Sequence, residues 1–145
     1  MREMIELPDD SLRYISHEIV GNTIVIHAES TSVRGRCPYC GTVSEKIHSR
    51  YTRKLQDLPI QGKKVRLLLQ IKKFFCVNED CTHKTFAEPF AFFETKANQT
   101  KRLQEAIIRV ALTQSSVSAS KYLRGSVADV SKSTICNLLK KEHGQ

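Results

Sequence analysis

The chain lacks several features that would assign its class directly. It has no tryptophan and only 7% aromatic residues, which indicates modest hydrophobic cores. It has no apolar run near the roughly 18 residues needed to span a bilayer, and its first residues lack the basic-then-apolar layout of a signal peptide. At 145 residues it has room for one domain or two small ones. These absences exclude a large enzyme fold and favour a cytoplasmic protein with no membrane partner.

Cysteine, in contrast, is arranged in a definite pattern. Four of the five cysteines form two close pairs, a C-x2-C and a C-x4-C separated by 35 residues. Tetrahedral zinc prefers four soft thiolates, and a site with four protein ligands leaves no open position for a water or a substrate. We therefore expect one structural zinc ion held by Cys37, Cys40, Cys76 and Cys81. Cys136 has helical spacing in another segment and is interpreted as a small, partly buried residue.

Two alternatives to four cysteine ligands remain open at this stage. The sequence Cys-Pro-Tyr-Cys at 37–40 is also that of a thiol redox centre, but such a centre needs its first cysteine at a helix N-terminus. Turn-forming residues flank the pair here instead. His48 or His83 could replace one cysteine as a ligand, although polar loop histidines are usually only solvated.

The first 95 residues contain mainly strand patterns. Residues 14–20 and 23–28 are rich in Ile and Val and flank Gly21-Asn22, which predicts a β-hairpin. Residues 46–54 form an extended basic segment that ends at 57–59 and is followed by a turn at 61–62. Residues 64–72 alternate between apolar and polar side chains and lead into the second cysteine pair, which predicts a half-buried strand. Two cysteine turns at the ends of paired strands make a zinc-ribbon-like module.

From residue 98 the pattern becomes helical. Thr100 can cap a first helix with an apolar stripe, Ser116 a short second helix, and Ser131 a third. Three short helices with a basic third helix are typical of a helix-turn-helix, although other trihelical bundles bind proteins. The predicted fold class is thus α+β. It has a zinc-ribbon-like β domain with an N-terminal β-hairpin over residues 1–95, followed by a three-helix helix-turn-helix domain over residues 96–145.

The net charge of +8 is unevenly distributed along the chain. Residues 30–75 carry +9 and residues 100–145 carry +5, whereas residues 1–29 carry −4 and residues 76–99 carry −2. Two basic blocks indicate two surfaces facing a polyanion, although charge runs are often only a solvated face. Together with a zinc module and a candidate recognition helix they predict double-stranded DNA as the partner. The expected DNA contacts are Arg50, Arg53, Lys54, Lys132, Ser133, Asn137, Lys140 and Lys141, with Asn137 reading adenine and the last two lysines holding phosphates.

Several quoted segments resemble a known family. The run Cys37-Pro-Tyr-Cys40-Gly41, the segments 48–53 and 57–62, and the stretch from Cys76 to Pro89-Phe90 are similar to the N-terminal zinc-binding region of bacterial insertion-sequence transposases of the ISL-three family. The helical part from Thr100 to Lys141 resembles the helix-turn-helix that follows in that family. The resemblance covers nearly the whole chain.

This resemblance implies a DNA-binding part of a transposase that recognises the terminal inverted repeats of its element. It also implies zinc on the four cysteines and association with copies of the chain or with full-length transposase. The family's catalytic carboxylates follow the helix-turn-helix, and none of the fifteen acidic residues here can be assigned to them, so we expect no cleavage activity. The alternatives are a zinc-containing transcriptional regulator with the same DNA-binding parts, a thiol oxidoreductase, and a protein-interaction module.

Overall fold

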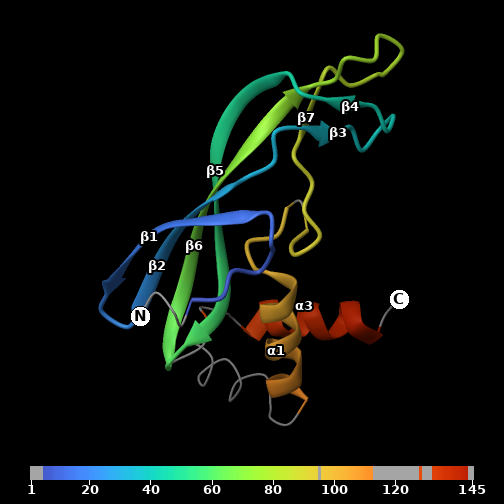
Figure 1. Cartoon of the computed structure of the whole chain (residues 1–145). Coiled ribbons are helices and arrows are strands. Elements are labelled where there is room, and N and C mark those ends of the chain that lie inside the picture. Colours follow the sequence, from blue (N-terminus) through green and yellow to red (C-terminus); the bar gives the residue numbers. More distant parts are fainter. Residues whose placement is uncertain (1–4, 95, 113–127, 129–131, 144–145) are drawn as a thin grey trace.

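The computed structural model describes residues 5–94, 96–112, 128 and 132–143. Strands dominate this part of the chain, with two helices after them (Figure 1). The elements in chain order are β1 (Leu12–Val20), β2 (Thr23–Ser30), β3 (Gly35–Arg36), β4 (Val43–Ser44), β5 (Ile47–Ile60), β6 (Lys63–Phe75), β7 (Thr85–Ala87), α1 (Lys101–Ala111) and α3 (Lys132–His143).

One mixed sheet organises the molecule. Its strand order is β1-β2-β6-β5, and β7 also pairs with β6. The predicted hairpin of β1 and β2 is confirmed, and Gly21 supplies the positive φ of 60° that its tight turn requires. The predicted turn at 61–62 joins β5 to β6 as an antiparallel hairpin, with φ of 49° at Gln61 and 74° at Gly62. The sequence did not indicate that β2 and β6 pair in parallel and join the two hairpins.

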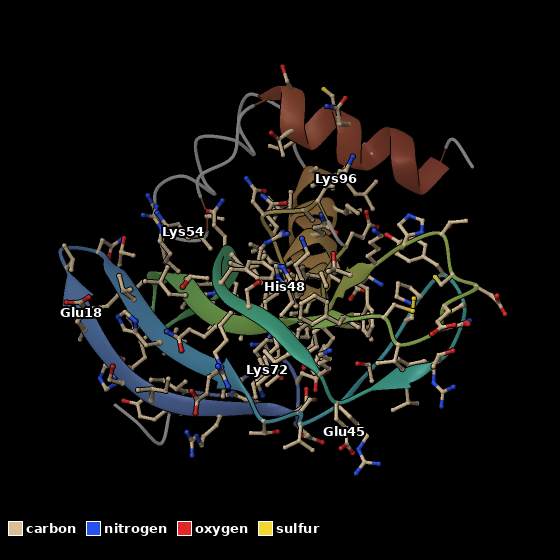
Figure 2. All side chains as sticks on the ribbon, turned by 90° about the horizontal axis from the view of Figure 1, so that it is seen from above. Glu18, Glu45, His48, Lys54, Lys72 and Lys96 are labelled. Atoms are coloured by element: carbon tan, nitrogen blue, oxygen red, sulfur yellow. The ribbon has the colours of Figure 1, made fainter. Side chains whose placement is uncertain are left out.

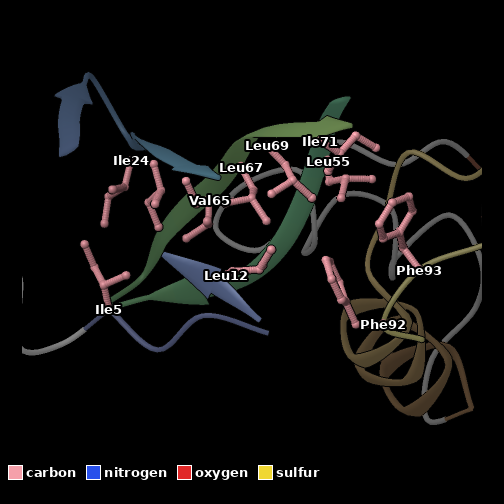
Figure 3. Close-up of a cluster of buried hydrophobic side chains, with 12 residues drawn as sticks. Ile5, Leu12, Ile24, Leu55, Val65, Leu67, Leu69, Ile71, Phe92 and Phe93 are labelled. Atoms are coloured by element: carbon pink, nitrogen blue, oxygen red, sulfur yellow. The ribbon is translucent and has the colours of Figure 1, made fainter. Parts of the chain in front are cut away.

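The alternation in β6 sets which face of this sheet is buried. Val65, Leu67, Leu69 and Ile71 are all at most 3% exposed, as the pattern predicts. They pack with side chains of β2 and β5 and are covered by residues from segments outside the sheet, namely Ile5, Phe92 and Phe93 (Figure 3). Residues at the intervening positions of β5 and β6 are exposed, such as Thr52 and Gln70, or half-buried, such as Leu68. The sheet therefore has one packed face and one open face.

Strand β5 is longer than the sequence pattern predicts. It runs past Asp57 to Ile60, where we expected the extended segment to end at 57–59. Its pairing with β6 shifts register between Asp57 and Ile60, and Pro59 lies in this irregular part. Proline is tolerated at such a point because its missing N–H interrupts no regular ladder bond.

Helix α1 begins as part of the sheet edge. The predicted cap is confirmed, since the Thr100 hydroxyl accepts a hydrogen bond from Leu103 N. Gln56 of β5 donates its backbone N–H to Asn98 and accepts one from Thr100, at 2.9 and 3.0 Å. The apolar stripe of α1 then packs against α3 and against Leu58 of β5. Helix α1 is thus anchored to β5 before it turns into the second core.

A buried carboxylate strengthens this junction. Asp57, whose side chain is 5% exposed, accepts hydrogen bonds from the Thr100 hydroxyl at 2.7 Å and from Arg102 Nε and Nη2 at 2.8 and 2.6 Å. Arg102 Nη2 also donates to the carbonyl of Glu6. The hydrogen bonds to Asp57 raise the pKa of the Arg102 guanidinium, so this cation stays charged. The cluster therefore links β5, the start of α1 and the N-terminal segment.

The predicted fold class is wrong in its second half. The described residues are mostly β, and after the zinc-binding part they contain the two helices α1 and α3 and no three-helix helix-turn-helix domain. The expected second helix from Ser116 and the expected cap Ser131 lie outside the described residues. The physical reason is that the strand-forming residues build one large sheet, to whose edge α1 is bonded. The domain boundary at residue 95 stays a prediction.

Neither helix in the described part of the chain has the length and apolar run needed to cross a membrane.

The zinc-binding strands β3 and β4 and the helices lie toward opposite ends of the long β5–β6 hairpin (Figure 1). The β5–β6 hairpin therefore connects the two functional candidates, the cysteine cluster and the open sheet face.

Candidate metal centre and basic sheet face

The structure brings the four paired cysteines together. The sulfurs of Cys37, Cys40, Cys76 and Cys81 all lie within 4.8 Å of one another. The Cys37–Cys81 and Cys40–Cys76 Sγ distances are 3.9 and 3.6 Å. Four sulfurs at about 2.3 Å from a tetrahedral zinc ion would be separated by about 3.8 Å. The cluster therefore fits one structural zinc ion with a complete protein shell.

Local backbone turns aim the sulfurs inward. In the first pair, Gly41 N donates to the Cys37 carbonyl and Cys37 N donates to the Thr42 carbonyl, at 2.8 and 2.9 Å. In the second pair, Cys76 N donates to the Lys84 carbonyl, and Cys81 N donates to the Asn78 carbonyl. Strands β3 and β4 hold the first turn, while β6 leads directly into the second. The two halves of the centre are thus fixed by backbone pairing on both sides.

The two alternatives to four cysteine ligands do not fit this geometry. Cys37 and Cys40 lie in the turn between β3 and β4, so the first cysteine does not begin a helix as a redox centre requires. His48 contacts Ser49 and the edge of the Phe75 ring. His83 stacks on Tyr39 with ring centroids 3.4 Å apart. Both histidines are outside the sulfur cluster among the described residues, and the His83–Tyr39 stack instead joins the two cysteine turns.

The thiols differ in how readily they lose a proton. Hydrogen bonds to the hydroxyl and backbone of Thr42, and then to Asn78, lower the pKa of Cys40 to about 6. The backbone hydrogen bond from Asn78 favours the thiolate of Cys76, but burial and hydrogen bonds to the other three cysteines raise the pKa of Cys76 to about 12. Four thiolates this close repel one another without a cation, and a divalent metal ion removes that cost.

A small aromatic core supports the metal centre. Phe74 and Phe86 stack at 5.7 Å between centroids and are buried together with Cys37. Gly35 lies against them, and a Cβ at this position would meet the Phe74 ring at 2.9 Å and the Phe86 ring at 3.0 Å. Because Phe74 is fully buried, its ring has little room to move. Gly35 is therefore required for the approach of β3 to β6.

We expect Gly35→Ala to lower the free energy of unfolding by about 1–3 kcal/mol, since the added methyl group overpacks the Phe74–Phe86 core. Thermal unfolding of the zinc-loaded protein measures the change. Gly41→Ala serves as a comparison at the same end of the molecule: its Cβ meets nothing within 4 Å, but its φ of 79° makes the substitution strained through the backbone. Replacing Phe86 with leucine should recover part of the lost free energy of unfolding in the Gly35→Ala variant. The same replacement should recover none of it in the Gly41→Ala variant. No recovery in Gly35→Ala would contradict the overpacking explanation.

The three predicted DNA contacts on β5 fall on different faces. Arg50 and Lys54 are exposed and project on the open face of the sheet. Arg53 lies on the packed face, where its guanidinium donates to the carbonyl of Ala97 and sits 5.2 Å from the centre of the Phe93 ring. Arg53 thus ties the aromatic segment to β5 and is poorly placed to meet a phosphate.

The remaining predicted contacts all lie on α3. Ser133 and Asn137 are exposed there, and Lys132, Lys140 and Lys141 are in the same helix. Cys136 is half-buried on α3 and stands apart from the metal centre. The prediction that these five residues contact DNA was based on a helix-turn-helix, which the described residues do not form. It stays a prediction without that geometric support.

The DNA contacts predicted from the sequence did not include several polar side chains of the open face. Arg66 and Gln70 of β6 are exposed there beside Lys54 and Thr52 of β5. The alternation in β6 was a sufficient signal that its even-numbered residues share a face. The antiparallel register, which places Gln70 opposite Thr52 and Arg66 opposite Gln56, was not readable from the sequence.

Comparison with known protein families gives a match to part of the chain. Residues 34–81 match a family described as the zinc-finger of transposase IS204/IS1001/IS1096/IS1165. No curated protein matches the chain. No solved structure matches it either. The matched segment, about a third of the chain, contains both cysteine pairs and the β5–β6 hairpin between them. Residues 34–81 are thus similar to the zinc finger of these transposases.

Proposed function

We propose that this chain binds duplex DNA at the terminal inverted repeats of an insertion sequence and acts as the DNA-recognition part of a transposase. The observation that carries the proposal is the transposase-type zinc finger over residues 34–81, built on four cysteines that fit one zinc ion. The zinc has a structural role, because four thiolates leave no position for a substrate. Its function is to fix the end of the β5–β6 hairpin.

Charge on the same hairpin supports a polyanion as the ligand. Arg50, Lys54 and Arg66 are exposed on the open face of the sheet and form no ion pair within the described residues. Unpaired cations on a rigid strand pair can release counterions from a phosphate backbone, which gives affinity that falls as salt rises. Their position on one face of two adjacent strands gives them a common direction of approach.

The proposal assigns binding and no cleavage to the chain. None of its carboxylates is assigned a catalytic role, and the buried ones are used in the fold. Asp57 holds Arg102, and Glu88 accepts hydrogen bonds from the Ser30 hydroxyl and Lys72 N. Incubation of supercoiled DNA with the protein and Mg²⁺ or Mn²⁺ should leave the DNA intact. Nicking that depends on Mg²⁺ or Mn²⁺ and follows the protein through purification would contradict this assignment.

The experiment that tests the proposal is a selection from sheared DNA of the source organism. Zinc-loaded protein is incubated with the fragments at about 0.15 M salt, where nonspecific electrostatic binding is reduced, and the retained DNA is sequenced. We expect enrichment of paired, inverted terminal sequences. Enrichment of promoters would support a transcriptional regulator in place of a transposase part. A retained pool equal to the input would overturn sequence-specific DNA recognition.

A further inference from the structure

Two adjoining hollows are present on the open face of the main sheet. The first, of about 250 Å³, is lined by residues of β5 and β6 that include Lys54, Gln56 and Arg66, together with Asn98. The second, of about 340 Å³, spans all four long strands and is lined by Ile15, Ser16, His27, Ala28, Thr52, Leu68 and Gln70. They adjoin because Leu68 of the second lies directly opposite Lys54 of the first. The open face is thus hollowed across β5 and β6.

The two hollows differ in chemistry. The first contains two cations, Lys54 and Arg66, which are exposed and form no ion pair among the described residues. The second is lined by hydrogen-bonding side chains that include no lysine or arginine, and by the apolar side chains of Ile15 and Leu68. Duplex DNA presents an anionic phosphate beside the uncharged edges of a base pair, so it requires a cationic site next to a polar site without lysine or arginine. Phosphate contacts fix position, and uncharged polar and apolar groups read base edges.

We propose that this face is the sequence-reading surface of the protein. In this arrangement Lys54 and Arg66 hold phosphates of duplex DNA, and Gln70 and Thr52 contact base edges in the major groove. The inference rests on the proposed DNA-binding function and extends it by naming the reading residues. It moves sequence recognition from α3, where the sequence had suggested it, to the sheet.

Register and exposure support the reading pair. Thr52 and Gln70 face each other across β5 and β6, and both side chains are exposed. Opposed side chains in an antiparallel pair have Cβ atoms about 5 Å apart, so both can reach one base pair or two adjacent ones. Glutamine makes a bidentate contact to adenine, and an apolar neighbour such as Leu68 can contact a thymine methyl group. The site therefore favours an A·T pair at the position beneath Gln70.

Charge on the rest of the open face sets the orientation of the DNA. Glu29 of β2 is paired with Arg13, and Glu18 of β1 lies 3.6 Å from His27. Carboxylates thus lie on the β1–β2 half, while Lys54 and Arg66 lie on the β5–β6 half and form no ion pair with any residue that the structure describes. Figure 2 shows Lys54 on the β5 side and Glu18 on the β1 side. A phosphate backbone is attracted to the cations of the β5–β6 half and repelled by the carboxylates of the β1–β2 half, so it should follow the β5–β6 hairpin.

The test is selection from a random 20-base-pair duplex pool by the zinc-loaded full chain, followed by binding of the selected duplex at several salt concentrations. Gln70→Ala should lose the preference for A·T at one position, a discrimination of about 5- to 100-fold for a bidentate contact. Lys54→Ala and Arg66→Ala should keep the selected sequence, weaken binding to every duplex, and each lower the salt slope by about 1.

Two control variants make the outcome specific. Arg34→Ala removes a cation at the zinc-binding end, where Arg34 faces Glu45 at 3.6 Å, and should leave the salt slope unchanged. Asn137→Ala removes the exposed candidate reader on α3 and should leave the selected sequence unchanged. Of the five substitutions, only Lys54→Ala and Arg66→Ala change the charge of the open face. Unchanged melting temperatures establish that each variant is folded.

The outcomes separate this inference from the proposed function. Suppose that the wild type and Gln70→Ala select the same sequence and Asn137→Ala does not. Then α3 reads the DNA and the inference about the sheet is overturned, although the proposed function stands. Equal or tighter binding to a single strand of the selected sequence would overturn the duplex as ligand. If the wild type binds no duplex at all, the proposed function itself fails.

Discussion

Replacing Cys76 with serine is expected to leave the protein unable to hold one zinc ion per chain and to lower its melting temperature by about 10 °C or more. A neutral serine hydroxyl does not replace a thiolate, and the three remaining sulfurs form an incomplete tetrahedral shell. Structural zinc in zinc-finger peptides contributes an apparent binding free energy of about 10–16 kcal/mol, so losing even a fraction of it has a large effect. Metal content by mass spectrometry and thermal unfolding measure both results.

Cys136→Ser is the matched control for this experiment. Cys136 is half-buried on α3, outside the sulfur cluster, and its variant should keep the full zinc content. Because the Phe74–Phe86 core at the metal centre is separate from the core of the main sheet, Cys76→Ser should retain most of its strand signal in circular dichroism. Stoichiometric zinc and wild-type stability in Cys76→Ser would show that the four-cysteine assignment is wrong.

The second large effect is expected from Asp57→Ala, which should lower the free energy of unfolding by about 3–5 kcal/mol. This carboxylate is 5% exposed and accepts hydrogen bonds from Thr100 and from two nitrogens of Arg102. Its removal leaves the partly buried Arg102 cation without its counterion and the Thr100 hydroxyl without an acceptor. The junction of β5 and α1 depends on both contacts, and denaturant unfolding measures the loss.

An exposed ion pair supplies the comparison. Arg34 and Glu45 lie 3.6 Å apart with side chains 64% and 69% exposed, so Glu45→Ala should change stability by no more than about 1 kcal/mol. In a double-mutant cycle, Arg102→Ala combined with Asp57→Ala should be less destabilising than the sum of the single variants, because the two residues share one interaction. Additive effects would place the loss outside the Asp57–Arg102 contact.

The metal centre could be predicted from the sequence because it depends on local spacing. Cys37 and Cys40, and likewise Cys76 and Cys81, are each brought close by one turn, and the hairpin between the pairs was readable from the alternation of Val65 to Ile71. The Thr100 cap was predictable for the same reason, since its acceptor role involves a residue only three positions away. Features that depend on contacts within a few residues can be predicted without knowledge of the fold.

The mixed sheet depends on contacts that no local pattern encodes. The parallel pairing of β2 with β6 joins Thr23 to Lys64, about forty residues apart, and requires the two hairpins to meet in one specific register. The apolar period correctly predicted a helix after Thr100, but the sequence did not show that this helix is attached to the sheet. The backbone of Asn98 and Thr100 is hydrogen-bonded to Gln56, so α1 begins at the sheet edge. The open-face residues Arg66 and Gln70 became candidates only once β5 was placed beside β6.

The most direct test of where this protein meets DNA is amide chemical-shift mapping by NMR, which suits a zinc-loaded chain of 16.5 kDa. A selected duplex is titrated into the labelled protein at about 0.15 M salt. We predict that the largest shifts cluster on β5 from Arg50 to Lys54 and on β6 from Arg66 to Gln70, with saturation at a fixed stoichiometry. Shifts confined to α3 or to the cysteine turns, with the β5–β6 hairpin unchanged, would contradict the account.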